Sequence, residues 1–240
     1  MLRTFAKTLL ASLLCAVAIS ASAAPILIKE TGLGNGQWTN SLTLPIQSTP
    51  ANYWAGLQTL VIDNVDTVLA FCVDPWELSP TSNQSYEIND LGSIFSSSTA
   101  NFINELYSKF YASTLENTVA GANAAAGFQL ALWEIIADHD FILDGTGLVA
   151  TNAKTNQTIV DVANEMLSQL NGILGDDIYS FTLYTSGKSN GEGSTKGFQD
   201  YLVANKVPGN KVPEPASALL LITALGGGLL IGRRRRQPQD

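Results

Sequence analysis

The sequence has few of the residues on which most catalytic and metal sites depend. Its 240 residues include two cysteines and one histidine, His139. A zinc site at His139 would need carboxylates as its other ligands, which is unusual. Serine hydrolase chemistry would also depend on His139, and the G-x-S-x-G elbow is absent. A glycine loop for phosphate is absent too, so we predict that the protein is not a conventional enzyme and uses no cofactor.

Positive charge is scarce in the central part of the chain. Residues 24–206 contain no arginine, six lysines and nineteen acidic residues, a net charge of −13 with the histidine neutral, whereas the whole chain carries −8. Such a surface repels the phosphates of nucleic acids and the head groups of anionic lipids. The composition therefore excludes nucleic-acid binding but selects no partner.

The first 23 residues have the pattern of a secretory signal peptide. Two basic residues are followed by an apolar stretch at residues 9–19, too short to span a bilayer, and then by Ala21-Ser22-Ala23, an A-x-A-like cleavage site. We expect cleavage before Ala24. This removes Cys15 and leaves Cys72 as the one cysteine of the mature protein. A leftover cysteine in an exported chain indicates a reactive thiol, a partner on another chain or simple packing.

The C-terminal end carries a second apolar segment. Residues 216–232 are uncharged and almost wholly apolar, and Arg233, Arg234, Arg235 and Arg236 follow directly. Seventeen residues in a helix reach about 25 Å, the short end of a membrane span. Because clustered arginines stay on the cytoplasmic side, we predict a transmembrane helix that holds the body outside the inner membrane.

This end resembles the PEP-CTERM sorting signal, also catalogued as the ice-binding protein C-terminal domain. The resemblance lies in Pro213, Glu214 and Pro215, followed by the short span and the arginine cluster, so that the segment covers residues 212–236. It implies export in a Gram-negative bacterium, cleavage near Pro-Glu-Pro by an exosortase-like enzyme, and release to the cell surface or an extracellular polysaccharide matrix. It implies sorting only, because no Thr-x-Thr ladder for an ice-binding face is present.

The pattern of residues 24–206 predicts one α+β domain with an antiparallel sheet and about three helices. A short linker at residues 207–211 would join it to the tail. Strands are expected at 25–29, 38–47, 53–63, 67–73, 178–184 and 198–203, and helices at 99–115, 122–137 and 158–174. A hairpin turn is expected at residues 64–66, and a mobile loop at 188–196.

One strand and one helix place two unusual residues in the interior. Cys72 ends the apolar run 68–73, and Gln129 lies on an apolar face of its predicted helix. An unpartnered buried amide costs about 1–3 kcal/mol, so Gln129 needs a partner. A buried cysteine and a buried glutamine can form an internal thioester when the thiolate attacks the carboxamide and ammonia leaves. Apolar surroundings protect such a bond from water.

The pair resembles the thioester domains of bacterial surface adhesins within residues 53–140. Phe71-Cys72-Val73 matches the cysteine motif, and the segment Phe128-Gln129-Leu130-Ala131-Leu132-Trp133 matches the glutamine motif. The resemblance implies covalent adhesion to an amine or hydroxyl group on a surface or polysaccharide. Alternatively, Cys72 is a small packed residue and the protein is a non-covalent component of the matrix.

Two other sites stay open on the sequence alone. Cys72 and His139 could form a Cys-His hydrolase, although a strand cysteine would then have to be exposed. The acidic loop from Asp138 to Asp144 could bind a cation, but it lacks the spacing of a calcium loop.

Overall fold

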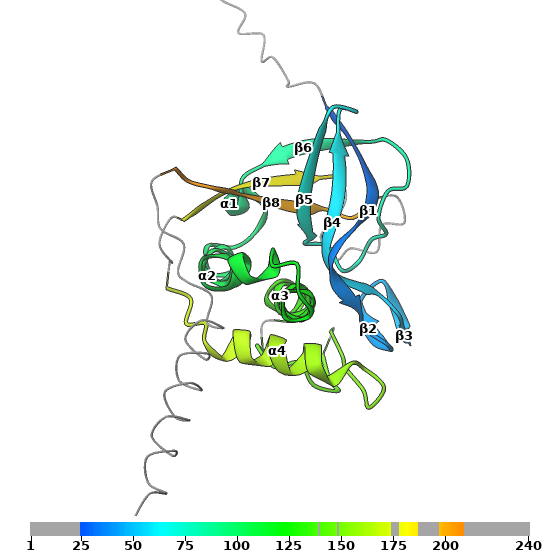
Figure 1. Cartoon of the computed structure of the whole chain (residues 1–240), viewed down its shortest axis with the longest axis vertical. Helices are drawn as coiled ribbons and strands as arrows, with labels where there is room; N and C mark the ends of the chain where they lie inside the picture. Colours follow the sequence, from blue (N-terminus) through cyan, green and yellow to red (C-terminus); the bar gives the residue numbers. More distant parts are fainter. Residues whose placement is uncertain (1–24, 139, 148, 174–177, 187–196, 209–240) are drawn as a thin grey trace, which may run out of the picture.

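Six antiparallel strands close into a barrel, with helices packed below it in the view of Figure 1. The computed structural model describes residues 25–138, 140–147, 149–173, 178–186 and 197–208. The barrel order is β1-β4-β5-β8-β7-β6, formed by β1 (Ile26–Trp38), β4 (Trp54–Ile62), β5 (Asp66–Cys72), β6 (Gln84–Asn89), β7 (Tyr179–Thr185) and β8 (Tyr201–Lys206). A separate hairpin consists of β2 (Leu42–Leu44) and β3 (Gln47–Ala51). The predicted α+β class with an antiparallel sheet is confirmed.

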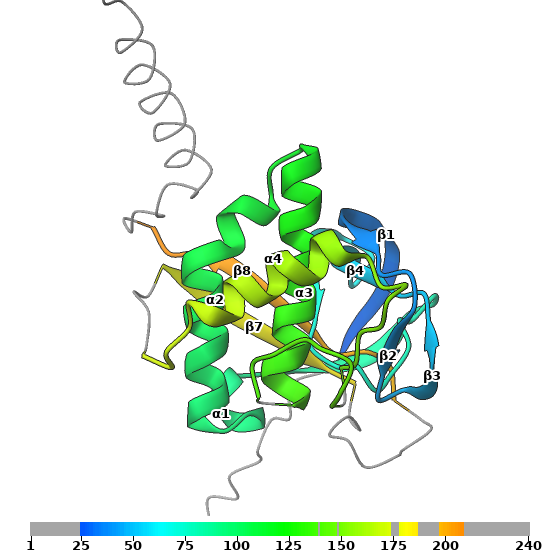
Figure 2. The same ribbon diagram turned by 90° about the horizontal axis from the view of Figure 1, so that it is seen from below.

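Four helices are described: α1 (Leu91–Ile94), α2 (Ser97–Thr114), α3 (Val119–Ala137) and α4 (Gln157–Ser168). Side-chain oxygens cap the three longer ones at their N-termini, where Ser96, Thr118 and Asn156 accept backbone N–H groups. α3 contacts α2, α4, β1 and β4, and therefore lies between α4 and the barrel. Seen from below in Figure 2, α4 crosses in front of α2 and α3.

Several element boundaries differ from those predicted. The strand expected at 38–47 is interrupted, because Asn40 and Ser41 adopt left-handed conformations between β1 and β2. The hairpin turn between β4 and β5 falls at Asp63 and Asn64, whose positive φ angles form the turn that the twist of paired strands favours. β3, β6 and the short α1 were not predicted. β6 gave no apolar pattern, because Tyr86 is its one buried residue.

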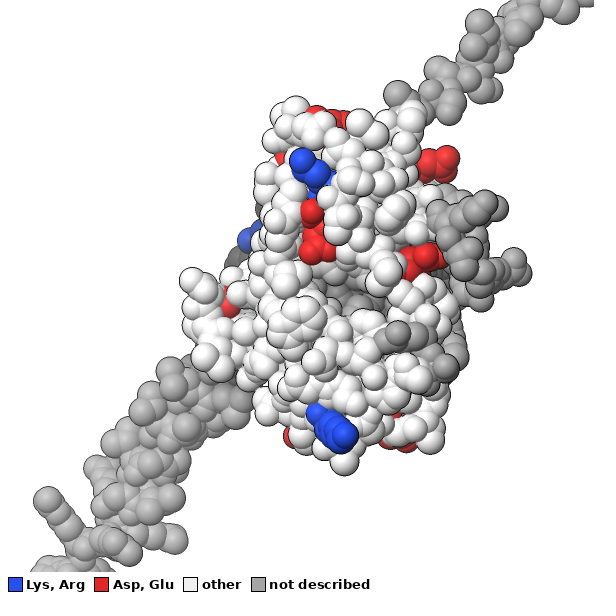
Figure 3. Space-filling view, turned by 90° about the vertical axis from the view of Figure 1, so that its right-hand side faces the viewer, with Lys and Arg blue, Asp and Glu red and all other residues white. Residues whose placement is uncertain are grey.

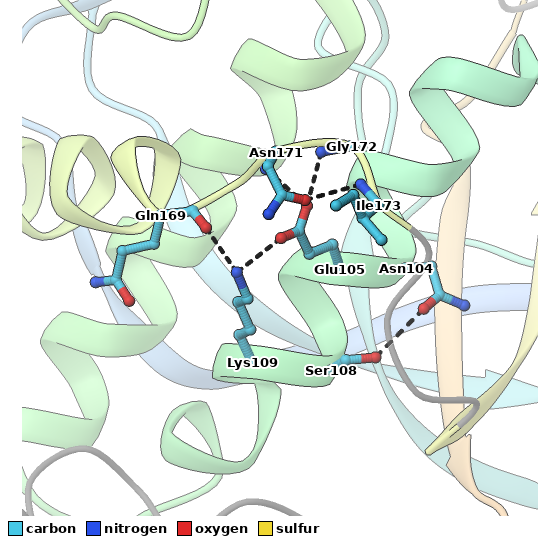
Figure 4. A network of polar contacts seen from close by, with 8 residues as sticks. All are labelled: Asn104, Glu105, Ser108, Lys109, Gln169, Asn171, Gly172 and Ile173. Carbon is cyan, nitrogen blue, oxygen red and sulfur yellow. Dashed lines mark hydrogen bonds and ion pairs between the residues drawn. The ribbon is translucent and has the colours of Figure 1, made fainter.

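α4 ends at Ser168, six residues before the predicted end at 174, because the following turn is held by α2. The carboxylate of Glu105 on α2 accepts the backbone N–H groups of Asn171 and Gly172, both at 2.9 Å (Figure 4). Lys109 joins Glu105 at 2.7 Å and donates to the carbonyl of Gln169 at 2.6 Å. Burial raises the pKa of Glu105, but these donors outweigh it and the pKa is lowered. The network attaches the end of α4 to α2.

The buried apolar residues form two clusters on either side of the barrel wall. The smaller cluster fills the barrel and includes Ile28, Leu60, Tyr86 and Tyr201. The larger one joins the strands to the helices, and eight of the twelve buried residues of α3 belong to it. On the face shown in Figure 3, charged side chains are few and scattered, so they form no continuous patch there.

α3 is also the one helix in the described ranges that is long and apolar enough to cross a membrane by length and composition. Its place between the barrel and α4 accounts for this apolarity, because a helix covered on all sides is apolar all round. The predicted signal peptide, transmembrane helix and sorting motif lie outside the described residues, as does the loop at 188–196. Of the predicted linker, Val207 and Pro208 are described, and the N–H of Val207 donates to the carbonyl of Ile178 at 2.9 Å.

Candidate functional site

The side chain of Gln129 is bound to the backbone of Cys72. The Cys72 N–H donates to Gln129 Oε1 at 3.2 Å, and Gln129 Nε2 donates to the Cys72 carbonyl oxygen at 2.7 Å. Both residues are fully buried. The carboxamide therefore pairs with Cys72 as a residue of a neighbouring strand would, although 57 positions separate the two in sequence.

This pairing is possible because β4 leaves β5 before Cys72. The ladder between the two strands ends at Gln58↔Ala70, and its register, continued, would set Gly56 opposite Cys72. Gly56 instead lies against Gly36 of β1, so closely that a Cβ on Gly56 would stand 2.3 Å from the carbonyl oxygen of Asn35. The N–H of Val73 donates to the carbonyl of Asp200, directly before β8. Since alternate residues of a strand bond to alternate sides, Cys72 faces the side that β4 has vacated. Gln129 takes the vacated place.

Aromatic packing fixes the helix at this position. Phe71 and Phe128, which precede Cys72 and Gln129, stack with ring centroids 4.5 Å apart and an interplanar angle of 29°. Tyr107 of α2 meets both rings edge-on. The stacked pair locks the register of α3 on β5, so the carboxamide has one position available to it.

The sulfur of Cys72 is held by the residue that follows the strand by two positions. The thiol donates to the Asp74 carbonyl at 3.3 Å, and the Asp74 N–H donates to the sulfur at 3.3 Å. Burial raises the pKa of the Cys72 thiol well above its ordinary value, and the carboxylates of Asp74 and Asp200 add to the rise. The N–H of Asp74 and the indole N–H of Trp133 act in the opposite direction. The resting group is therefore the neutral thiol.

The other candidate site from the sequence is the acidic loop that follows α3, together with the end of that helix. Glu134 is buried, and among the described residues no hydrogen bond of ordinary geometry reaches either carboxylate oxygen. Burial raises its pKa to about 9, with contributions from Asp140 and Asp138, so Glu134 is a neutral acid at pH 7. Asp144 is engaged within its own loop by the N–H and hydroxyl of Thr146. Within the described ranges, no three His, Cys, Asp or Glu side chains could together hold a metal ion. His139 lies outside those ranges.

Two contributors to the site were not predicted from the sequence. Asp74 acts through its backbone, which no side-chain pattern reveals. Trp133 was noted only as the last residue of the glutamine motif, although an indole also carries an N–H donor. Glu134 had one visible signal, because it is the single charged residue of α3.

Comparisons with known proteins add one structural likeness. No protein-family model and no curated protein matches the chain. Among solved structures, the N-terminal thioester domain of the fibronectin-binding protein SfbI from Streptococcus pyogenes is similar, with 15% identity and a TM-score of 0.44. The match covers 77% of this chain and 95% of that one. This likeness is too distant to carry an inference about the fold or chemistry of the chain.

Proposed function

We propose that the protein is an exported adhesin of the cell surface or extracellular matrix that attaches covalently through a thioester between Cys72 and Gln129. The observation that carries the proposal is the hydrogen bonding of the Gln129 carboxamide to both backbone groups of Cys72 in a fully buried site. The two reactants of this bond, a thiol and a carboxamide, thus belong to residues that are bonded to each other in the interior.

The contacts suit the reaction. Gln129 Oε1 accepts the Cys72 N–H, and this donor would stabilise the negative charge that develops on the oxygen when sulfur attacks. For the attack, the sulfur turns from Asp74 toward the carboxamide carbon. The bond from sulfur to that carbon forms, the bond from the carbon to Nε2 breaks, and the thiol proton leaves with Nε2 as ammonia. An amine or hydroxyl of the target would later replace the sulfur and return a proton to it.

Burial would lengthen the lifetime of such a thioester. Cys72 belongs to the same buried cluster as Phe71, Phe128 and Trp133, and neither Cys72 nor Gln129 is exposed. Excluding water protects an acyl-thiol from hydrolysis until a nucleophile is admitted. The protein would then act once, as a covalent binder and not as an enzyme with turnover.

A second candidate function has its own supporting observation. The two hydrogen bonds already satisfy the Gln129 amide, so its position is explained by closing the open edge of β5. On this alternative, the protein is a non-covalent structural or binding component of the polysaccharide matrix, and Cys72 only packs.

Intact mass separates the two. If the thioester forms, the purified chain is lighter than its sequence by one ammonia and gains the mass of methylamine on treatment. Cys72→Ala and Gln129→Ala should abolish both effects. Gln58→Ala is the matched control, because Gln58 is another buried glutamine whose amide bonds to Gln199 instead. A wild-type chain of unmodified mass that ignores methylamine contradicts the covalent function.

Sorting is a separate part of the proposal and rests on the sequence of the tail. The exosortase-like enzyme would cut near Pro213 to Pro215, after the segment from residue 216 has held the body in the inner membrane. N-terminal sequencing of the extracellular protein should begin at Ala24, and C-terminal peptides should end near the Pro-Glu-Pro motif. Recovery of the full-length chain from the cytoplasm contradicts this route.

A further inference from the structure

The sulfur of Cys72 has to carry negative charge in the proposed chemistry, yet its surroundings oppose that charge. Thiolate is both the nucleophile when the thioester forms and the leaving group when a target replaces it. Burial disfavours the thiolate most, and the carboxylates of Asp74 and Asp200 add to this effect. A site with only these neighbours would hold the thiol inert.

Two N–H groups have the opposite effect. The Asp74 N–H donates to the sulfur at 3.3 Å, and its direction is fixed by the end of β5, where Val73 is bonded to Asp200 of the chain entering β8. The indole of Trp133 belongs to α3, one helical turn after Gln129, and therefore lies on the same face of the helix. Donors from two different elements thus act on one sulfur atom, and both lower the pKa of its thiol.

The indole N–H has no other use among the residues that the structure describes. Trp133 is 1% exposed, and its Nε1 lacks a partner of ordinary hydrogen-bond geometry. A buried donor left unpaired costs about 1–3 kcal/mol, so this one needs an explanation. No hydrogen bond of ordinary geometry joins it to the neutral thiol, whereas a charged sulfur accepts a shorter and stronger bond than a thiol does.

We propose that the Trp133 indole N–H and the Asp74 backbone N–H form a donor pair that stabilises the Cys72 thiolate during both the formation and the opening of the thioester. The inference rests on the proposed function for its role in the reaction, while the effect of the N–H groups on the titration of the thiol is independent of it. Trp133 is then a catalytic residue as well as part of the core.

The test removes the N–H and keeps the ring. In full-length chain carrying Cys15→Ala, Cys72 is the one cysteine left, so the Raman S–H stretching band reports this thiol alone. Residue 133 is changed by Trp133→Phe, and separately by site-specific incorporation of 3-benzothienylalanine, which has the shape of tryptophan with sulfur in place of N–H. Trp54→Phe is the matched control, since its indole N–H donates to the Leu57 carbonyl at 3.1 Å.

Both changes at 133 should slow ammonia loss and methylamine incorporation about tenfold, the contribution of one hydrogen bond to a charged group. In Gln129→Ala and Gln129→Leu backgrounds, where no thioester can form, they should raise the pH at which the S–H band disappears by about one unit. Trp54→Phe should change neither quantity.

Two results overturn the donor pair: an unchanged titration of the S–H band in the Gln129 variants, or a 3-benzothienylalanine protein that reacts at the wild-type rate. Failure of the proposed function has a different signature, because then no variant loses ammonia while the titration of the band still responds to residue 133.

Discussion

The loss in the free energy of unfolding when the Gln129 amide is removed measures how far the fold depends on it. Gln129→Ala leaves the N–H and the carbonyl of Cys72 without partners at a site with no exposure. Each orphaned group costs about 1–3 kcal/mol, so the free energy of unfolding should fall by roughly 2–6 kcal/mol. This is a large share of the stability of a domain of this size.

The measurement is made by urea unfolding in a Cys72→Ala background, which prevents the thioester and leaves both backbone groups in place. Gln157→Ala is the matched control, because Gln157 is an exposed glutamine whose amide bonds to Asp161 on the same helix. That change should stay within about 0.5 kcal/mol. A loss below about 1 kcal/mol for Gln129→Ala refutes the reasoning, since water or a shifted β4 would then be satisfying Cys72.

Two further changes test the surroundings of α3. The pKa of Glu134 is raised from 4.5 to about 9, so between these pH values the folded state holds a proton that the unfolded state releases. The free energy of unfolding should therefore fall as pH rises through this range. Glu134→Gln should remove this pH dependence of the urea midpoint, and an unaltered pH dependence contradicts the assignment. Gly127→Ala would place a Cβ 2.5 Å from the Val162 side chain, so it should cost about 1–3 kcal/mol in thermal or urea unfolding. Val162→Ala should restore most of that loss, and a lack of coupling between the two changes would mean that α4 does not lie where the structure has it.

The sequence predicted which residues would meet but not how. Helical spacing put Gln129 on a buried face, and the apolar run at 68–73 put Cys72 at the end of a strand. Their contact through the Cys72 backbone depends on where β4 turns away, and this is decided by the close approach of Gly36 and Gly56. Two glycines far apart in sequence give no sign of facing each other.

Element ends were harder to predict than element types, for a physical reason. The apolar spacing continues to Leu170, so periodicity extends the last helix beyond Ser168. The chain instead turns at Gly172, because Glu105 accepts its N–H from another helix. Tertiary hydrogen bonds decided this boundary, and no local pattern contains them.

The strand-like pairing of Gln129 also bears on whether the proposed attachment could be reversed. Gln129 donates to the Cys72 carbonyl through the amide hydrogen that lies on the same side as Oε1, because both bonds reach one residue. After reaction with a primary amine, a trans amide would carry the target's carbon chain in the place of that hydrogen. Restoring the pairing would require the cis form, which costs about 2.5–4 kcal/mol. The carboxamide that made the site would then be unable to dock on Cys72 again, so the same hydrogen bonds that prepare the first reaction would make it one-way.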